Sequence, residues 1–264
     1  YNDYEYGKYD LIIGNPPYYV MKKKDVSTTM YKYFDGRPNI FILFIIKSLE
    51  MLSENGIICF ILPRSFLNCL YYDKTRKYIN KTCIIMNIID CEDNFIETEQ
   101  KTIMLIIKKT VSEENHTNIN NKSHTFNINE YMIFGVKSEI VKLHELYIGS
   151  MKLSELGFVV NVGSIVWNQH KDILTNDSTK TLLIYSSDIK NNTLNIKKYK
   201  DDNKKNYIDK PGIKTPLLVI NRGYGVGKYN FEYCLINCEN YENREENVCE
   251  YLIENHLICI RHID

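Results

Sequence analysis

The chain has 264 residues, 44% of them hydrophobic, which is enough to bury the core of one large domain or of two modest ones. It carries 33 Lys and Arg against 33 Asp and Glu, so its overall charge gives no sign of a nucleic-acid partner. The sequence has neither an apolar run of membrane-spanning length nor a signal-like start, so we expect no membrane partner and a cytoplasmic protein, or one inside the host cell if the source is a virus.

The first apolar segment ends in an unusual turn. Residues 9–14 (YDLIIG) predict a short strand, and Asn15-Pro16-Pro17-Tyr18 follow it directly. Two adjacent prolines cannot continue a strand ladder or a helix. Because ligands of open α/β sheets lie beyond the carboxyl ends of the strands, this turn predicts a functional site.

Strands and helices alternate as far as residue 110. Apolar residues at helical spacing predict a helix over residues 39–56, ending at Gly56, and a shorter amphipathic helix over residues 69–80. Continuous apolar runs predict three further strands, over residues 57–63, 83–90 and 102–109. Such strands, separated by helices, are typical of a parallel or mostly parallel sheet covered on both faces. We therefore expect an α/β domain that forms part of a doubly wound, Rossmann-like sheet.

The second half of the sequence has a different texture. Residues 111–137 begin with a polar stretch and predict a linker or exposed loop, and a helix is expected at about Ser138 to Tyr147. From about residue 150, short β-like runs alternate with turns rich in Asn, Asp, Lys and Gly. We expect the α/β domain over residues 1–110, the linker, and a mainly β (α+β) domain over residues 138–264.

The turn after the first strand offers a specific set of chemical groups. The prolines fix φ, so the carbonyl groups of Asn15 and Pro16 point in set directions, and the Asn15 amide supplies another acceptor. Two oxygen atoms aimed at one point suit an exocyclic amino group, which has two N–H donors. Tyr18 can lie flat against an aromatic base. Together these groups would hold a planar ring and orient its amino nitrogen. A rigid turn without chemistry is the alternative.

The motif and the segments that follow it resemble the N6-adenine DNA methyltransferases. Asn15-Pro16-Pro17-Tyr18 is similar to the catalytic NPPY motif of that family, and residues 40–67 resemble the helix and strand that come next. Residues 94–109 resemble a later segment in which a Phe presses on the target adenine; that residue here is Phe95. The resemblance covers roughly residues 5–110, which makes the expected sheet part of a methyltransferase fold.

The resemblance implies methyl transfer from S-adenosylmethionine to a flipped adenine in double-stranded DNA. Tyr18 and Phe95 would sandwich the base, and Asn15 and the Pro16 carbonyl would accept both N6 hydrogens. Asn15 and Pro17 would also contact the cofactor. Positioning and electrostatics would supply the rate, with no strong general base.

The length of chain after the motif helps to sort the alternatives. NPPY also occurs in methyltransferases that act on protein glutamine or on rRNA guanine, which usually end soon after their last sheet strands. Here roughly 150 residues follow the last predicted strand of the sheet, which ends at residue 109. A target-recognition domain after the catalytic domain is therefore expected, as in a site-specific methyltransferase of restriction-modification type with a possible cognate restriction endonuclease. A non-catalytic DNA-binding specificity module, including one half of a split enzyme, is the competing hypothesis.

The position of the cofactor loop bears on activity. In this class a Gly-rich loop precedes NPPY, and the chain begins at Tyr1, so we expect a missing upstream cofactor-binding segment and an inactive fragment. The glycines of the sequence GYGVG lack the spacing of a phosphate-binding loop. These glycines are Gly223, Gly225 and Gly227, and they favour a hairpin or a DNA-facing loop over a cofactor site.

Several residues are candidates for DNA contact. Arg222 suits guanine or phosphate, and Asn168 and Gln169, beside Trp167 and His170, suit adenine edges. A polar turn with a core tryptophan is the alternative for the latter group. Lys22 and Lys23, with Lys24, follow the motif and are placed to touch phosphates, unless they form a solvated loop. The stretch from Lys190 to Lys228 contains ten basic and three acidic residues. Such a basic stretch suits contact with a phosphate backbone, or it forms a solvated face.

The cysteines point to a reduced protein. Several of the eight lie inside apolar runs, where a free thiol behaves as a small hydrophobic group. A zinc site near the C-terminus is conceivable, with ligands drawn from Cys234, Cys238, Cys249, Cys259, His256 and His262. Because no CxxC pair is present, we expect no metal.

Overall fold

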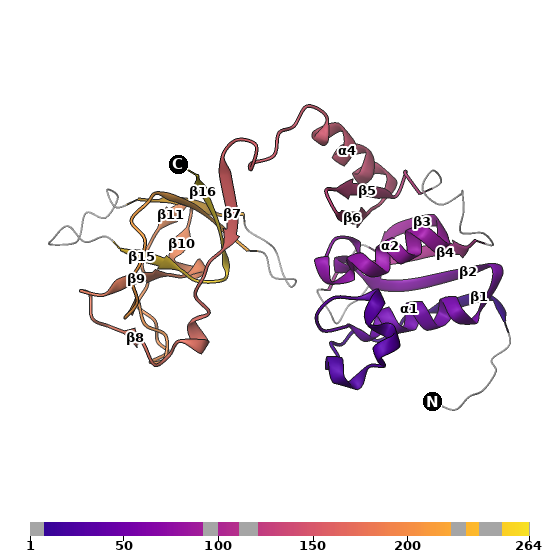
Figure 1. Cartoon of the computed structure of the whole chain (residues 1–264), viewed down its shortest axis with the longest axis horizontal. Helices are drawn as coiled ribbons and strands as arrows, with labels where there is room; N and C mark the ends of the chain where they lie inside the picture. Colours follow the sequence, from indigo (N-terminus) through magenta and orange to yellow (C-terminus); the bar gives the residue numbers. More distant parts are fainter. Residues whose placement is uncertain (1–7, 92–99, 111–120, 223–230, 238–249, 264) are drawn as a thin grey trace. The chain divides into compact units, whose positions relative to one another are not determined.

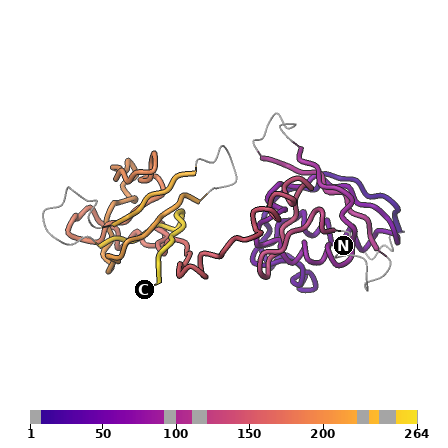
Figure 2. The backbone as a smooth tube through the Cα atoms, turned by 90° about the horizontal axis from the view of Figure 1, so that it is seen from above, coloured from indigo at the N-terminus to yellow at the C-terminus, as the bar shows by residue number. Residues whose placement is uncertain are grey.

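The computed structural model describes residues 8–91, 100–110, 121–222, 231–237 and 250–263, and the others are drawn in grey in Figures 1 and 2. The described chain forms two compact units, unit 1 up to Ser150 and unit 2 from Met151 onward. The expected division at residue 138 therefore differs from the one found. Each unit is described here by itself.

Unit 1 is built on a four-stranded sheet with the order β1-β2-β4-β3. Its strands are β1 (Tyr9–Gly14), β2 (Leu52–Pro63), β3 (Cys83–Cys91) and β4 (Thr102–Lys109). Strands β1 and β2 are parallel, whereas β4 is antiparallel to both of its neighbours, β2 and β3. The α/β class and all four predicted strands are confirmed. The sheet is mixed because residues 92–101, between β3 and β4, are fewer than the roughly one dozen that a parallel crossover requires.

Two helices connect the strands in the sequence, α1 (Ile40–Met51) between β1 and β2 and α2 (Asp73–Thr82) between β2 and β3. Helix α1 begins at Asn39, whose side chain accepts a hydrogen bond from the Phe41 N–H, and α2 follows a short 3-10 turn. Helix α1 ends five residues before the predicted stop at Gly56. Strand β2 already pairs with β1 at Leu52, and a register shift before Ile57 accommodates the intervening residues.

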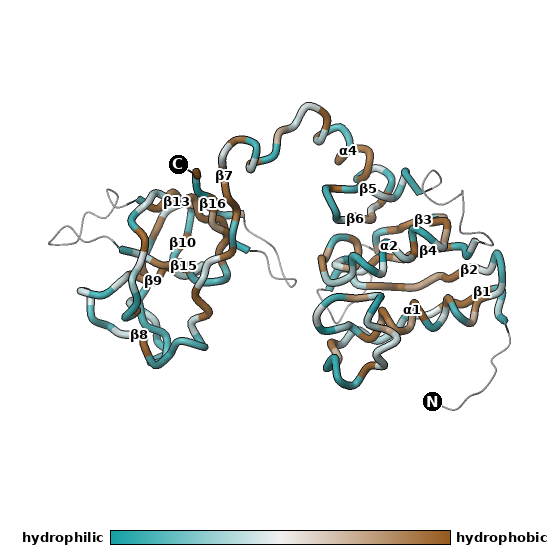
Figure 3. The backbone as a smooth tube through the Cα atoms, viewed as in Figure 1, coloured by the Kyte–Doolittle hydropathy of each residue, from teal (hydrophilic) through white to brown (hydrophobic). Residues whose placement is uncertain are grey.

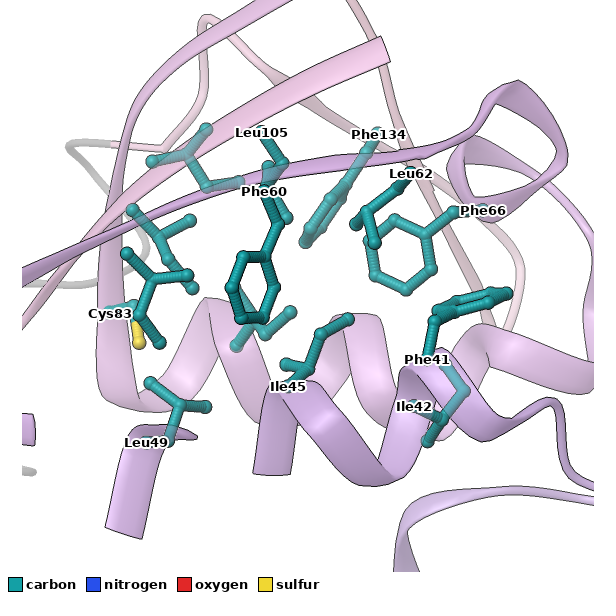
Figure 4. Close-up of a cluster of buried hydrophobic side chains, with 14 of the residues drawn as sticks. Phe41, Ile42, Ile45, Leu49, Phe60, Leu62, Phe66, Cys83, Leu105 and Phe134 are labelled. Atoms are coloured by element: carbon teal, nitrogen blue, oxygen red, sulfur yellow. The ribbon is translucent and has the colours of Figure 1, made fainter. Parts of the chain in front are cut away.

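The core of unit 1 lies on one face of the sheet. Figure 4 shows Phe41, Ile45 and Leu49 of α1 facing Phe60 and Leu62 of β2. Strand β2 runs mainly through hydrophobic residues (Figure 3). On β1, in contrast, Leu11 and Ile13 are 55% and 70% exposed. Within the described residues, then, the expected covering of both faces is not found along β1.

A hairpin and a helix complete unit 1 (Figure 1). They are β5 (Thr125–Ile128), β6 (Tyr131–Phe134) and α4 (Lys137–Tyr147). The predicted linker over residues 111–137 is therefore partly a folded element, and α4 confirms the predicted helix. The polar side chains that favoured a linker are partly buried, and Asn121 donates to the carbonyl of Cys83 and accepts from the N–H of Ile85.

Unit 2 is mainly β, as the sequence predicts, and its described residues contain 3-10 turns but no α-helix. Two four-stranded sheets, β15-β9-β12-β8 and β14-β13-β16-β7, are accompanied by the pair β10-β11. Leu182 and Ile253 of the first sheet share a buried cluster with Val219 and Leu257 of the second. The strands are β7 (Phe158–Val162), β8 (Leu174–Thr175), β9 (Thr181–Ile184), β10 (Ile189–Lys190), β11 (Thr193–Leu194), β12 (Tyr207–Ile208), β13 (Leu217–Asn221), β14 (Tyr233–Ile236), β15 (Tyr251–Ile253) and β16 (Leu257–His262).

Candidate active site

The candidate site lies at the edge of the unit 1 sheet where three strands end. Strands β1, β2 and β3 point in the same direction, so their carboxyl ends share this edge. Gly14, the last residue of β1, pairs with Phe60, and a side chain at Gly14 would lie 3.2 Å from the Phe60 ring. The end of β1 is therefore held close against β2, and Asn15 to Tyr18 follow immediately.

The turn after β1 is held against the start of α1. The carbonyl of Tyr19 accepts a hydrogen bond of 2.9 Å from the N–H of Ile40, and the N–H of Met21 donates to the carbonyl of Pro38 at 2.8 Å. Pro16 is buried, whereas Asn15 and Pro17 are exposed. These two hydrogen bonds thus hold the residues after the turn against the start of α1, while the Asn15 side chain remains exposed.

Tyr18 links the turn to β2 and to the core. Its hydroxyl oxygen lies 2.7 Å from the Asn15 Oδ1 atom and 2.8 Å from the carbonyl oxygen of Ile61. Its half-buried ring meets the Phe41 ring edge-on, with centroids 6.1 Å apart. Burial, and to a smaller extent the nearby Cys91 thiol, raises the pKa of Tyr18 to about 12. The hydroxyl therefore stays protonated at physiological pH and has one proton to donate.

The other residues predicted for this site are Phe95 and two lysines. Phe95 lies outside the described residues, but Cys91 and Thr102, on either side of its segment, pair with each other at the site edge. Lys22 and Lys23 are exposed, and the Lys23 ammonium lies 4.6 Å from the centre of the Tyr31 ring. Base stacking by Tyr18 and Phe95, and phosphate contact by the lysines, stay predictions.

Comparison with known proteins finds a family that is similar to the segment carrying this site. Residues 2–96, which include Asn15 to Tyr18 and the first three strands, match the family described as Eco57I restriction-modification methylase. Residues 2–96 are therefore similar to restriction-modification methylases, and they are called the methylase segment below. The methylase segment contains the carboxyl ends of β1, β2 and β3.

Three relatives extend the comparison. The type II methyltransferase M.AccI of Acinetobacter calcoaceticus is 34% identical over 116 residues, which are 40% of this chain and 21% of that protein. The modification methylase CviBIII of Paramecium bursaria Chlorella virus NC1A is 28% identical over 72% of this chain and 45% of its own length. The type II methyltransferase M.CvrRI of Paramecium bursaria Chlorella virus XZ-6E is 25% identical over 96% of this chain and 61% of its own length. The chain spans between 21% and 61% of these relatives.

In unit 2, beyond the methylase segment, the candidate DNA-contacting residues are connected through one turn. Arg222, which follows β13, donates through its guanidinium to the Asn255 carbonyl at 3.2 Å, and the Asn255 N–H donates to the Ile165 carbonyl at 2.8 Å. Ile165 leads into a 3-10 turn over Trp167–Gln169. The structure thus brings Arg222 and this turn to the same region of unit 2.

The residues of that turn differ in burial. Trp167 is half-buried and packs against a small buried cluster that includes Ile165 and Tyr185. Asn168 and Gln169 are exposed and His170 is half-buried. The tryptophan is therefore partly a core residue, and the two amides are accessible to a ligand. Gly223, Gly225 and Gly227 lie outside the described residues.

Sequence reasoning missed a lysine enclosed by aromatic rings. The Lys204 ammonium lies 4.1 Å from the ring centres of both Tyr185 and Tyr199, and 5.9 Å from that of Trp167. Burial lowers the pKa of Lys204, while the nearby carboxylates of Glu254 and Asp188 oppose that shift. The rings come from three separate segments, so no local pattern could have revealed the cluster. Lys204 ties the lysine-rich residues 197–205 to the Trp167 turn.

Other site classes find no support in the described part of the chain. No group of three or more His, Cys, Asp or Glu side chains there could hold a metal ion, and Cys238 and Cys249 lie outside it. The six described cysteines are free thiols, and burial raises the pKa of Cys83 and Cys259 to about 11. No described helix has the length and apolar character needed to cross a membrane.

Proposed function

We propose that the chain is part of a site-specific DNA methyltransferase that moves a methyl group from S-adenosylmethionine to N6 of an adenine flipped out of the duplex. The observation that carries this proposal is the exposed Asn15 amide at the carboxyl end of β1, followed by Pro16, Pro17 and Tyr18, inside a methylase segment. The names of the relatives support methyl transfer of restriction-modification type, and adenine is the acceptor that the motif chemistry favours.

The acceptor chemistry follows from the oxygen atoms at the turn. An exocyclic amino group has two N–H donors, and the Asn15 amide and the Pro16 carbonyl would accept one each. Holding both hydrogens in set directions localises the lone pair of N6, which is otherwise delocalised into the ring. The nitrogen would then be aligned to attack a sulfonium methyl group: the carbon–sulfur bond would break as the carbon–nitrogen bond forms, and one N6 proton would pass to water. A neutral Tyr18 with a pKa of about 12 is consistent with catalysis by positioning.

The groups at the turn fit the methyl-donor end of S-adenosylmethionine. Asn15 offers polar atoms and Pro17 an apolar surface, and both are exposed at the same edge. When bound, the cofactor supplies an electrophilic methyl group on a sulfonium. The neighbouring residues of this chain would exclude water and align the acceptor nitrogen.

We assign DNA contact in unit 2 to the region around the Trp167 turn. Exposed Asn168 and Gln169 can read adenine edges, and Arg222 can bind guanine or phosphate. Lys204, held among aromatic rings, keeps the lysine-rich residues 197–205 beside these groups. A basic loop next to exposed amides combines backbone attraction with base readout, which a target-recognition domain needs.

A salt titration tests this assignment. Changing both Lys198 and Lys200 to Gln in the full-length gene product is expected to weaken DNA binding and to lower the slope of log affinity against log salt by about two, because each lost phosphate contact removes about one unit. Both side chains are exposed. The matched control is Lys180→Gln, a lysine paired with Asp209 at 2.8 Å, which should leave the slope unchanged. Equal effects of both variants would refute a specific surface.

The acceptor class is tested by methyl transfer. The full-length gene product is incubated with labelled S-adenosylmethionine and with duplex DNA, ribosomal RNA or protein extract in separate reactions. Label in DNA is the expected result. Label in RNA or protein would favour the guanine or glutamine enzymes, and tight DNA binding without transfer would favour a specificity module. The same assay on residues 1–264 alone tests our expectation that this chain is inactive by itself.

A further inference from the structure

The Tyr18 hydroxyl has two close neighbours but a single proton. The carbonyl oxygen of Ile61, at 2.8 Å, can only accept a hydrogen bond, because it belongs to the backbone. The side-chain amide of Asn15, at 2.7 Å, can offer either its oxygen or its nitrogen. If the amide oxygen faces the hydroxyl, both neighbours are acceptors and one of them is left without a proton.

Reversing the amide resolves this conflict. The oxygen and nitrogen of an Asn side chain have almost the same shape, so their assignment follows from the hydrogen bonds they make. With the nitrogen toward Tyr18, the hydroxyl donates to Ile61 and accepts from the Asn15 NH₂ group. The amide oxygen then points away from the hydroxyl, on the exposed side of the turn. If instead the amide oxygen faced Tyr18, the Asn15 NH₂ group would face an incoming amino group, and two hydrogen-bond donors would meet without an acceptor.

We propose that the Tyr18 hydroxyl is a positioning group, which orients the Asn15 amide so that its oxygen faces the amino group to be methylated. This role rests on the proposed function and adds a second task to Tyr18, separate from contact of its ring with a base. The hydroxyl is suited to it because both ends are fixed: Ile61 is part of β2, and the ring packs edge-on against Phe41. The raised pKa of Tyr18 keeps the proton on its oxygen.

The test removes the hydroxyl while keeping the ring. In the full-length gene product, Tyr18→Phe is expected to lower the single-turnover methylation rate about tenfold, the effect of one oriented hydrogen bond, with KM for DNA changed by less than about twofold. Base flipping, followed by 2-aminopurine fluorescence at the target position, and the melting temperature should stay as in the parent. A loss of folding or of flipping would instead indicate a structural role.

An aspartate in place of Asn15 provides the matched background. The two oxygen atoms of a carboxylate are equivalent, so the new side chain needs no orientation, and Asn15→Asp is expected to retain measurable single-turnover activity. In that background Tyr18→Phe should cost less than about threefold, so the two changes are not additive. Equal losses in both backgrounds, no loss in either, or an inactive Asn15→Asp variant would overturn the orienting role. An inactive parent protein would overturn the proposed function, and this role with it.

Discussion

Replacing Asn15 with alanine in the full-length gene product should reduce methylation by at least about a hundredfold, the effect of removing one preorganised hydrogen-bonding group. Asn15 is exposed and its side chain contacts the Tyr18 hydroxyl, so the change leaves the core of unit 1 untouched. Binding of duplex DNA, measured by fluorescence anisotropy, should therefore change by less than about twofold, because the acceptor amine loses its partner only in the reacting complex.

Asn127→Ala is the matched control for that variant. Asn127 is an exposed asparagine of β5 in the same unit, so its removal tests the general effect of losing such a side chain. The control should methylate at the parental rate. Parental activity of Asn15→Ala would exclude the Asn15 amide from the reaction and remove the basis for the proposed mechanism.

Arg76 should be the residue whose loss most destabilises unit 1. Its side chain is fully buried, and it donates to the carbonyl groups of Met132, Phe66 and Cys69 at 2.6 to 2.9 Å. It thereby joins α2 to the β5–β6 hairpin. Arg76→Met removes this partner from three carbonyl groups, two of them in buried hydrogen bonds, and from the Asp73 carboxylate, and should cost about 3–5 kcal/mol of unfolding free energy.

Lys77→Met is the matched control for Arg76. The Lys77 ammonium pairs with the same carboxylate, Asp73, at 2.7 Å, but its side chain is 47% exposed. An exposed pair of this kind contributes about 0–1 kcal/mol. Urea unfolding of the two variants, followed by circular dichroism, separates the contributions. Similar losses in both would show that Arg76 acts through its ion pair alone and does not hold the hairpin.

The first 110 residues illustrate how far a local pattern predicts structure. All four strands and both helices of that region occur where apolar runs and helical spacing indicate. The direction of β4 was not predicted, because an apolar run carries no sign of its direction; the short stretch between β3 and β4 was the available signal. The end of α1 was predicted too late, since Gly56 is a usual stop but pairing with β1 begins at Leu52.

Long-range burial explains most of the remaining differences. The hairpin of β5 and β6 was expected to be a linker because Asn, Ser and His are common in loops. Asn121 and His124 are nevertheless buried: Asn121 donates to the carbonyl of Cys83, far away in the sequence, and the His124 ring lies within hydrogen-bonding distance of the Gly135 carbonyl. The lysine among aromatic rings depends on Trp167, Tyr185 and Tyr199 meeting in space. Asn15 to Tyr18 could be proposed as a candidate site from the sequence because they are four consecutive residues at the end of one strand, and their catalytic role stays a prediction.

We propose that the turn after β1 presents a pair of hydrogen-bond acceptors to the N6 amino group of adenine. Duplex DNA methylated by the full-length gene product is digested to nucleosides and analysed by mass spectrometry, with Asn15→Ala as the paired negative sample. We expect N6-methyladenine as the modified nucleoside, and we expect it to be absent from the Asn15→Ala sample. Methylcytosine in place of N6-methyladenine, or N6-methyladenine at equal levels in both samples, would contradict it.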